Sequence, residues 1–310
     1  MTFEQLRIFL KVAEHEHVTR AAELLHLTQS AVSGAIQTLE NNHQVKLFDR
    51  VGRGIRLTDE GRLLQEKAMS IIAAVQDAEA TLNDICGLRT GELRLHASQT
   101  ISSHWLPRHL MRFNSQHPGI TITQKVANTE QCLDAVRNGE CDLAYVEGAI
   151  DGLLTAVDHE RIEQRVVAED QLLLVSSPMH PWALHQPEAI ETHLTEKPWV
   201  MRERGSGTRS SFEAALRERG VDPDELPVAM EFTTNEAVCT AIQNSAAIGA
   251  VSKLVAAPLI ESGRMVRLPF PPALRPFRQL RMSERHFSRA ARAFCALLEP
   301  PTIPGIDPQT

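Results

Sequence analysis

The stretch from Val18 to Leu39 (VTRAAELLHLTQSAVSGAIQTL) constrains the fold of this chain more than any other, because it predicts two short helices joined by a tight turn. Apolar residues give the first helix one inner face, and its alanines allow a second helix to cross closely. The turn ends at Thr28, whose hydroxyl can accept hydrogen bonds from the free amides of the next helical turn. From Val32 to Leu39 apolar residues recur at i, i+3, i+4 and i+7, the spacing of one buried helical face.

The opposite face of the second predicted helix carries short, uncharged polar side chains. Ser30, Ser33 and Gln37 share this face, and Gln29 lies beside them. Such donors and acceptors suit the edges of bases in the major groove of DNA. An ordinary amphipathic hairpin with a solvated polar face would show the same pattern, and this stretch alone does not decide between the two.

The flanking residues favour the helix-turn-helix. Together they resemble the N-terminal domain of the LysR-type transcriptional regulators, and the resemblance extends more loosely over nearly the whole chain. The matching residues are Leu6, Phe9, Val12, Ala13, Thr19–Ala22, Leu27–Ser33, Ile36, Leu39, Glu40, Leu47, Phe48, Arg50, Leu57, Thr58 and Gly61. The chain departs from the family at His43-Gln44, where the family usually has Leu-Gly. A glycine there would adopt the left-handed conformation that ends a helix, which Gln44 adopts at a cost of roughly 1 kcal/mol.

A charged hairpin is predicted next, with strands at 46–48 and 54–57 and a turn at 51–54. Beside a helix-turn-helix it fits a wing better than a merely solvated loop. Residues 1–65 carry eight basic and eight acidic side chains, but between Asn41 and Leu57 four basic residues face one acid, Asp49. Few phosphate contacts per subunit are therefore expected, with base readout and dimerisation supplying the rest. The predicted DNA-binding residues are Arg20, Thr28, Gln29, Ser30, Ser33, Gln37, Lys46, Arg50, Arg53 and Arg56.

Thr58 begins a long predicted helix, with Asp59 and Glu60 at its positive end. Apolar residues then recur at alternating steps of four and three, a heptad seam that a lone helix cannot bury. Packing against its own domain is the alternative, but a period of 3.5 favours a partner helix. We therefore expect a homodimer, whose twofold symmetry supplies the two reading heads of a dyad site. The predicted dimerisation residues are Leu64, Ala68, Ile71, Val75, Ala78, Leu82 and Ile85.

From Gly91 the chain alternates between strands and helices, which predicts βαβ units and an open parallel sheet. The predicted strands are 92–97, 120–126, 143–146, 172–176, 199–201, 228–232, 248–251 and 279–282, and the predicted helices are 105–116, 130–138, 210–219, 236–243, 254–261 and 288–298. About 210 residues exceed one small doubly wound domain. Two lobes are therefore expected, and the family resemblance implies their arrangement, with crossovers near Glu163–Ala168 and Val266–Pro269.

The predicted fold class is α+α/β. It consists of a winged helix-turn-helix DNA-binding domain (1–58), a linker and dimerisation helix (59–90), an effector-binding domain (91–300) and a flexible, proline-rich tail (301–310). The resemblance implies a two-lobed, periplasmic-binding-protein-like effector domain. Lobe I is expected at 91–163 and 269–300, and lobe II at 164–268.

Polar residues gather at four predicted junctions from strand to helix, where ligands of open α/β sheets bind. Each junction alone could merely cap a helix, as Asn128 and Gln131 would. Their recurrence, with Arg202 and Arg209 nearby, favours a polar cleft for an anion, while Glu147 in the same cleft disfavours a highly charged one. Resemblance of Gly91–Glu130 to regulators of sulfur or carbon assimilation hints at a small inorganic or carboxylate anion. The predicted effector-binding residues are Ser98, Gln99, Thr100, Ser102, Asn128, Thr129, Glu147, Arg202, Ser206 and Thr208.

Composition narrows the class of protein further. The net charge of −7 argues against a general nucleic-acid binder, and no apolar run approaches the ~20 residues that span a bilayer. The N-terminus lacks a signal segment, so we expect a cytoplasmic location. The five cysteines are scattered and predict reduced thiols rather than a redox switch. His15-Glu16-His17 fits a solvated loop better than a metal site, because adjacent side chains point apart.

Rival functions fit the sequence less well. The chain lacks the G-x-S-x-G, phosphate-loop, G-x-G-x-x-G and H-E-x-x-H motifs, so no catalytic residue, metal or cofactor is expected. A solute-binding protein would need export and would leave the first ninety residues unexplained. We therefore predict a ligand-responsive, sequence-specific DNA-binding transcriptional regulator of the LysR type. It is expected to bind double-stranded DNA as a homodimer, with a homotetramer implied by the resemblance and RNA polymerase as a possible partner.

Overall fold

The computed structural model describes residues 1–52, 54–85, 91–148, 150–185, 187 and 189–298. The chain divides into two compact units, the first containing Met1–Asn83 and the second most of the remainder. Several predictions fall outside the described residues: the wing residue Arg53, the segment 86–90, the tail 301–310 and the side chain of Ile85.

Three helices form the body of the first unit. They are α1 (Phe3–His15), α2 (Val18–Leu25) and α3 (Gln29–His43). The predicted capping box of Thr2 and Gln5 opens α1, and the Thr28 hydroxyl accepts from the Ala31 amide at the start of α3. Gln44 ends α3 in the left-handed conformation (φ 52°), as the departure from Leu-Gly predicted. The helix-turn-helix is thus confirmed.

One apolar core holds this unit together. Phe9 and Val12 of α1, Ala21 of α2 and Val32 of α3 are all fully buried in it. The ring of Phe9 also packs against Phe48, with centroids 5.6 Å apart, and so attaches the wing to the first helix.

The wing consists of β1 (Phe48–Val51), paired antiparallel with β2 (Gly54–Leu57). The predicted first strand, 46–48, was placed two residues too early. The buried carboxylate of Glu40 instead accepts hydrogen bonds from the amides of Leu47 (2.8 Å) and Phe48 (3.3 Å). Burial alone would raise the pKa of Glu40, but these bonds and the one from Lys46 outweigh it and lower that pKa.

The sheet of the second unit is built from two parallel groups of strands. Lobe I contributes β4 (Ile120–Ala127), β3 (Gly91–Ser98) and β5 (Leu143–Glu147), and lobe II contributes β9 (Ile248–Ser252), β7 (Trp199–Arg202) and β8 (Val228–Phe232).

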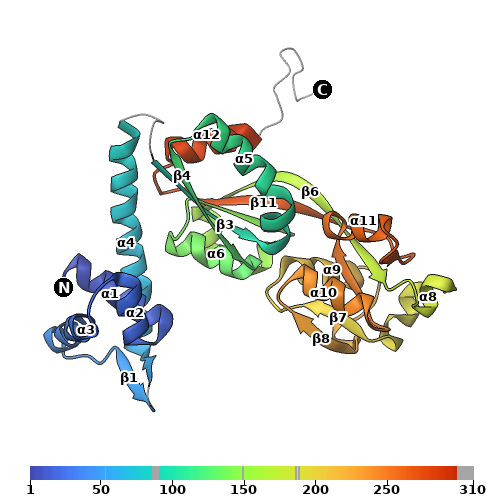
Figure 1. Cartoon of the computed structure of the whole chain (residues 1–310), viewed down its shortest axis with the longest axis horizontal. Coiled ribbons are helices and arrows are strands. Elements are labelled where there is room, and N and C mark those ends of the chain that lie inside the picture. The colour runs from blue at the N-terminus through green and yellow to red at the C-terminus, as the bar shows by residue number, and fades with distance from the viewer. Residues whose placement is uncertain (53, 86–90, 149, 186, 188, 299–310) are drawn as a thin grey trace. The chain divides into compact units, whose positions relative to one another are not determined.

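Two long strands, β6 (Ile162–Ser176) and β11 (Ala273–Met282), run between the lobes (Figure 1). They pair antiparallel with each other, and β11 also pairs antiparallel with β5 and β6 with β9. The expectation of a wholly parallel sheet was therefore wrong, because a chain that enters the other lobe and returns must run in both directions.

The first predicted crossover lies within β6, but the second was misplaced. Val266–Arg267 forms a short strand, β10, that still pairs with the lobe II end of β6. The chain returns only in β11, where Ala273 lies opposite Leu172 and Met282 lies opposite Ile162.

Helices cover both lobes. Lobe I holds a π-helical turn, η1 (Ile101–Trp105), with α5 (Leu106–Gln116), α6 (Thr129–Asn138) and α12 (Arg289–Leu298). Lobe II holds α8 (Pro181–Leu184), α9 (Gly207–Arg217), α10 (Asn235–Gln243) and α11 (Lys253–Glu261). The short α7 (Ala156–Arg161) and the 3-10 turns η2 (Asp151–Leu153), η3 (Ile190–Glu196) and η4 (Pro223–Glu225) were not predicted, nor was α8.

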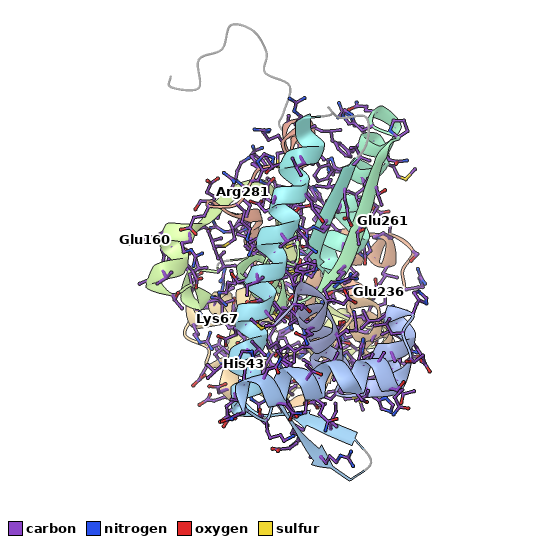
Figure 2. All side chains as sticks on the ribbon, turned by 90° about the vertical axis from the view of Figure 1, so that its left-hand side faces the viewer. His43, Lys67, Glu160, Glu236, Glu261 and Arg281 are labelled. Atoms are coloured by element: carbon purple, nitrogen blue, oxygen red, sulfur yellow. The ribbon has the colours of Figure 1, made fainter. Side chains whose placement is uncertain are left out.

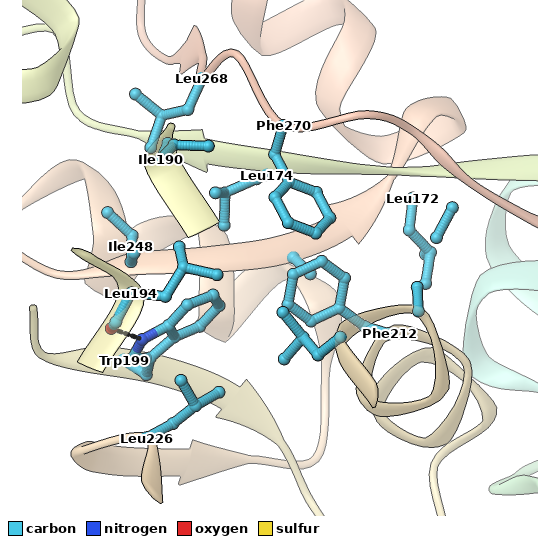
Figure 3. Close-up of a cluster of buried hydrophobic side chains, with 14 of the residues drawn as sticks. Leu172, Leu174, Ile190, Leu194, Trp199, Phe212, Leu226, Ile248, Leu268 and Phe270 are labelled. Atoms are coloured by element: carbon cyan, nitrogen blue, oxygen red, sulfur yellow. Dashed lines mark hydrogen bonds between the residues drawn. The ribbon is translucent and has the colours of Figure 1, made fainter. Parts of the chain in front are cut away.

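Each lobe has its own apolar core. Phe113, Phe277 and Phe294 are fully buried in lobe I. In lobe II the ring of Phe212 packs at a tilt between those of Trp199 and Phe270, and the Trp199 indole donates to the carbonyl of Leu194 at 2.8 Å (Figure 3). A second buried cluster lies in each lobe, around Leu133 in lobe I and around Val238 in lobe II. Because each cluster stays within one lobe, polar contacts define how the lobes meet.

The long helix α4 (Asp59–Ile85) starts in close contact with the wing. A Cβ at Gly61 would collide with the carbonyl oxygen of Leu47 and lie 2.9 Å from a Leu57 methyl carbon, whereas a Cβ at Gly34 of α3 would meet nothing within 4 Å. Replacing a helical glycine by alanine normally stabilises by about 0.5–1 kcal/mol. We expect Gly34→Ala to raise the free energy of unfolding by this amount. Gly61→Ala should instead lower it by roughly 1–3 kcal/mol, as overpacking does.

Chemical denaturation of the two full-length variants measures both effects. Equal stabilisation by both substitutions would show that α4 does not pack against the wing in this way.

Candidate functional site

The predicted reading surface of α3 is exposed. Gln29, Ser30, Ser33 and Gln37 all point away from the core, while Val32 on the same helix is fully buried. The Thr28 hydroxyl lies 3.1 Å from that of Ser30 at the helix start. The side chains predicted to contact DNA bases are therefore accessible rather than buried against their own domain.

The basic residues predicted to contact DNA come from α2, from the segment before the wing and from the wing itself. Arg20 of α2 is exposed beside Glu23, and Lys46 pairs with Glu40 at 2.8 Å. In the wing, which projects beyond α3 (Figure 2), Asp49 lies opposite Arg56 and Arg50 lies opposite Ile55. Since directly opposed residues share a face, Arg50 and Arg56 emerge from opposite faces of the hairpin.

The predicted dimerisation seam on α4 divides into two parts. Ala68 is fully buried and Leu64 partly buried in the unit's own core, so the alternative of packing against its own domain describes these two. The others are more open: Val75 is half-buried, and Ile71, Ala78 and Leu82 are exposed.

In the second unit a buried carboxylate lies where the two lobes meet. Glu147, the last residue of β5, is only 1% exposed. It accepts hydrogen bonds from Ser98, the last residue of β3, from Thr100 (3.2 Å) just after that strand, and from Thr208 (3.3 Å) in the first turn of α9. Three predicted hydroxyls and the predicted glutamate are thus brought together from both lobes.

Arg275 completes this cluster and was not predicted. It is 1% exposed on β11, bonds Asp170 of β6 through Nε (2.9 Å) and Nη2 (2.7 Å), and lies 3.4 Å from Glu147. Its Nη1 also donates to the Thr208 hydroxyl at 2.9 Å, and Asp170 accepts from Ser252 at 3.0 Å. One sequence signal could have revealed it: Arg275 shares its face of the strand with the apolar residues Ala273 and Phe277, so its side chain had to be buried.

A second set of contacts bridges the lobes through Gln99. Its Oε1 accepts from the backbone amide of Asn235 (3.1 Å) and from the Arg202 guanidinium (3.4 Å). Its Nε2 donates to the Glu236 carboxylate (2.8 Å). Asn235 also donates to the Thr100 hydroxyl at 3.0 Å, so both sets share Thr100.

The arginines predicted to attract an anion already have acidic partners. Arg202 pairs with Glu203 at 2.8 Å. Arg209 pairs with Glu213 at 2.7 Å and with Glu231. Arg275 also has an acidic partner, Asp170, but unlike these two arginines it forms an ion pair with Glu147 itself.

Most of the remaining predicted effector residues cap a helix or bond a neighbouring side chain, and do not contact Glu147. Asn128 caps α6 through the Gln131 amide (2.9 Å), Ser206 caps α9, and Ser102 bonds Gln124. The Thr129 hydroxyl is buried and has no hydrogen-bond partner among the described residues. A Cβ at Gly207 would lie 2.6 Å from that hydroxyl and collide with the carbonyl oxygen of Glu147, so glycine is required where these segments meet.

Among the described residues no three His, Cys, Asp or Glu side chains gather as a metal site. No described helix is both long and apolar enough to cross a membrane. Burial raises the pKa of the Cys132 thiol, and that of the Cys239 thiol to about 11, so these thiols are unreactive.

A helix-turn-helix followed by a two-lobed binding domain defines a class of transcriptional regulators. The family model described as "Bacterial regulatory helix-turn-helix protein, lysR family" matches residues 3–62, and the "LysR substrate binding domain" matches residues 87–300. The chain therefore belongs to the LysR family: it is a DNA-binding transcriptional regulator with an effector-binding domain.

Known relatives agree with this assignment. The chain is 29% identical over 306 residues to the HTH-type transcriptional regulator YeiE of Escherichia coli K12, covering 98% of this chain and 99% of that one. It is 32% identical over 270 residues to the RuBisCO operon transcriptional regulator of Allochromatium vinosum, covering 86% and 85%. These relatives are transcriptional regulators, not enzymes.

Solved structures show the same fold. Full-length CbnR in complex with its target DNA matches with a TM-score of 0.65 at 20% identity, over 96% of this chain and 99% of that one. The regulatory domain of Synechocystis CcmR in complex with 2-PG matches with a TM-score of 0.58 at 25% identity, over 67% of this chain and 96% of that domain.

The exposed polar face of α3 and the charged wing should contribute differently to DNA binding. We expect Ser33→Ala to reduce the preference for the cognate site over random DNA by roughly 1 kcal/mol, because a base contact is lost. Arg56→Ala should weaken binding to all sequences and reduce the salt slope by about 1, as loss of a phosphate contact does. Titrations of both variants at several salt concentrations measure these quantities, and reversed effects would contradict the assignment.

Loss of the buried guanidinium should be costly. Arg275→Leu leaves Glu147 and Asp170 buried without a counter-charge, so we expect the free energy of unfolding to fall by about 3–5 kcal/mol. Arg281→Leu on the same strand is the control, because Arg281 pairs with the half-exposed Glu163 (2.6 Å) and such pairs contribute about 1 kcal/mol or less. Urea denaturation compares the two, and similar losses would show that Arg275 does not balance a buried charge.

Proposed function

We propose that this regulator binds a small anion between its lobes and that this binding changes how the protein contacts DNA. The observation that carries the proposal is the convergence of hydroxyl and amide groups from both lobes on one buried centre. Ser98 and Thr100 reach it from lobe I, and Thr208 and Asn235 from lobe II. A ligand held by all four would contact both lobes at once.

Such a ligand can shift the lobes only if it binds their arrangements unequally. Hydroxyl donors and the start of α9 favour negative charge on the ligand. The match to the CcmR regulatory domain, whose structure contains 2-PG, supports a small-molecule ligand in this type of domain.

DNA recognition is proposed for the α3 surface and the wing, used twice by a homodimer. The exposed Ile71 and Leu82 on α4 support a partner helix, because exposed apolar residues at heptad spacing remain to be covered. We propose a homotetramer as the larger assembly, RNA polymerase as a further partner, and the cytoplasm as the location, since the DNA target lies there. An ordinary coupling free energy between effector and DNA sites would be about 1–3 kcal/mol.

The proposal is tested on the full-length protein. Binding sites are first selected from random DNA, and small carboxylates and inorganic oxoanions are then screened by thermal shift. We expect an anion that stabilises the protein also to alter its footprint on the selected site. Thr100→Val should abolish both responses while leaving DNA binding without the anion unchanged. Thr123→Val is the matched control, because that hydroxyl bonds Glu92 on the exposed side of β4.

Two outcomes would refute this function. In one, Thr123→Val and Thr100→Val affect the anion response equally. In the other, anions stabilise the protein without any change in the footprint.

A further inference from the structure

The centre of the proposed effector site already holds a carboxylate. The Glu147 side chain accepts hydrogen bonds from Ser98, Thr100 and Thr208 and forms an ion pair with Arg275 at 3.4 Å. These are the groups that an anion from solution would be expected to use: hydroxyl donors from two lobes, the first turn of a helix and one guanidinium.

Charge balance excludes a second anion at this place. Arg275 supplies one positive charge, while Glu147 and Asp170, both within its reach, carry two carboxylates. All three side chains are at most 1% exposed, so water screens their interaction weakly. An added anion would therefore meet strong repulsion while the Glu147 carboxylate remains in position.

Close contacts hold the backbone at Glu147 in place, whereas its side chain can rotate. Gly148 has a φ of 85°, and a Cβ there would collide with the Ser211 hydroxyl. Its amide donates to the carbonyl of Pro276 at 2.9 Å, and Gly207 packs against the carbonyl of Glu147. The carboxylate can therefore leave the centre only by rotation of the side chain.

We infer that the Glu147 carboxylate is a built-in occupant of the anion position, and that an anionic effector binds by replacing it on Ser98, Thr100, Thr208 and Arg275. This inference rests on the proposed function and adds a specificity rule to it. The effector presents one compact, singly charged carboxylate or oxoanion group, and its affinity is reduced by competition with Glu147.

Formate is the simplest probe, because it is the carboxylate of Glu147 without the chain. Full-length wild type, Glu147→Ala and Glu147→Gln are unfolded thermally in increasing sodium formate, with sodium chloride at equal ionic strength as the reference. Glu147→Ala removes the competitor and leaves Arg275 balanced by Asp170. It should bind formate at least about tenfold more tightly than wild type, because an internal competitor reduces the apparent affinity to the fraction of molecules in which the site is free.

Glu147→Gln keeps the size of the side chain and removes its charge. It should bind formate with an affinity between those of wild type and Glu147→Ala, and this comparison suffices if Glu147→Ala fails to fold. Asp158→Ala is the control for a lost buried carboxylate elsewhere, since Asp158 is also buried and pairs with Arg137 within lobe I at 2.7 Å. Formate should stabilise that variant no more than it stabilises the wild type.

Equal formate affinities for wild type and Glu147→Gln would overturn the inference. So would a formate response of Asp158→Ala as large as that of Glu147→Ala. Neither result contradicts the proposed function, because that function is tested by the anion-dependent footprint of the wild-type protein.

Discussion

The ion pair between Arg275 and Asp170 is the contact on which the arrangement of the second unit depends. The two residues lie directly opposite each other on β11 and β6, the strands that connect the lobes. Burying the ionised side chains of Arg275, Asp170 and Glu147 is costly unless each has partners. Arg275 donates to Thr208 and pairs with Glu147, and Asp170 accepts from Ser252. Because these partners come from both lobes, the charges of the cluster are balanced only when the lobes are in this arrangement.

The division of labour between apolar and polar contacts follows from this. The phenylalanine-rich core of lobe I and the Trp199 core of lobe II stabilise each lobe separately. The junction uses hydrogen bonds through Thr100, Gln99 and Asn235. Such bonds contribute about 1 kcal/mol each and depend on exact alignment, so a ligand can exchange them at low cost. Packed apolar surface would not permit this exchange.

Sequence patterns predicted the parts of this structure that depend on local spacing. The Thr28 cap, the left-handed Gln44 and the hydroxyls at Ser98, Thr100 and Thr208 follow from neighbours within a few positions. Arg275 and Asp170 were missed because they lie within strands and their partners are distant in the chain. The start of the wing was misplaced for a similar reason: Glu40, seven residues earlier, takes the Leu47 amide. The antiparallel return strand likewise depends on the whole topology rather than on any local pattern.

The glycine at the start of α4 has a mechanical consequence. With no side chain at Gly61, the helix backbone rests directly on the Leu47 carbonyl and the Leu57 side chain at the base of the wing. No flexible group lies between them to absorb movement. A tilt of the first turns of this 27-residue helix therefore moves the base of the hairpin with it, so the direction of the wing is coupled to the direction of the helix axis.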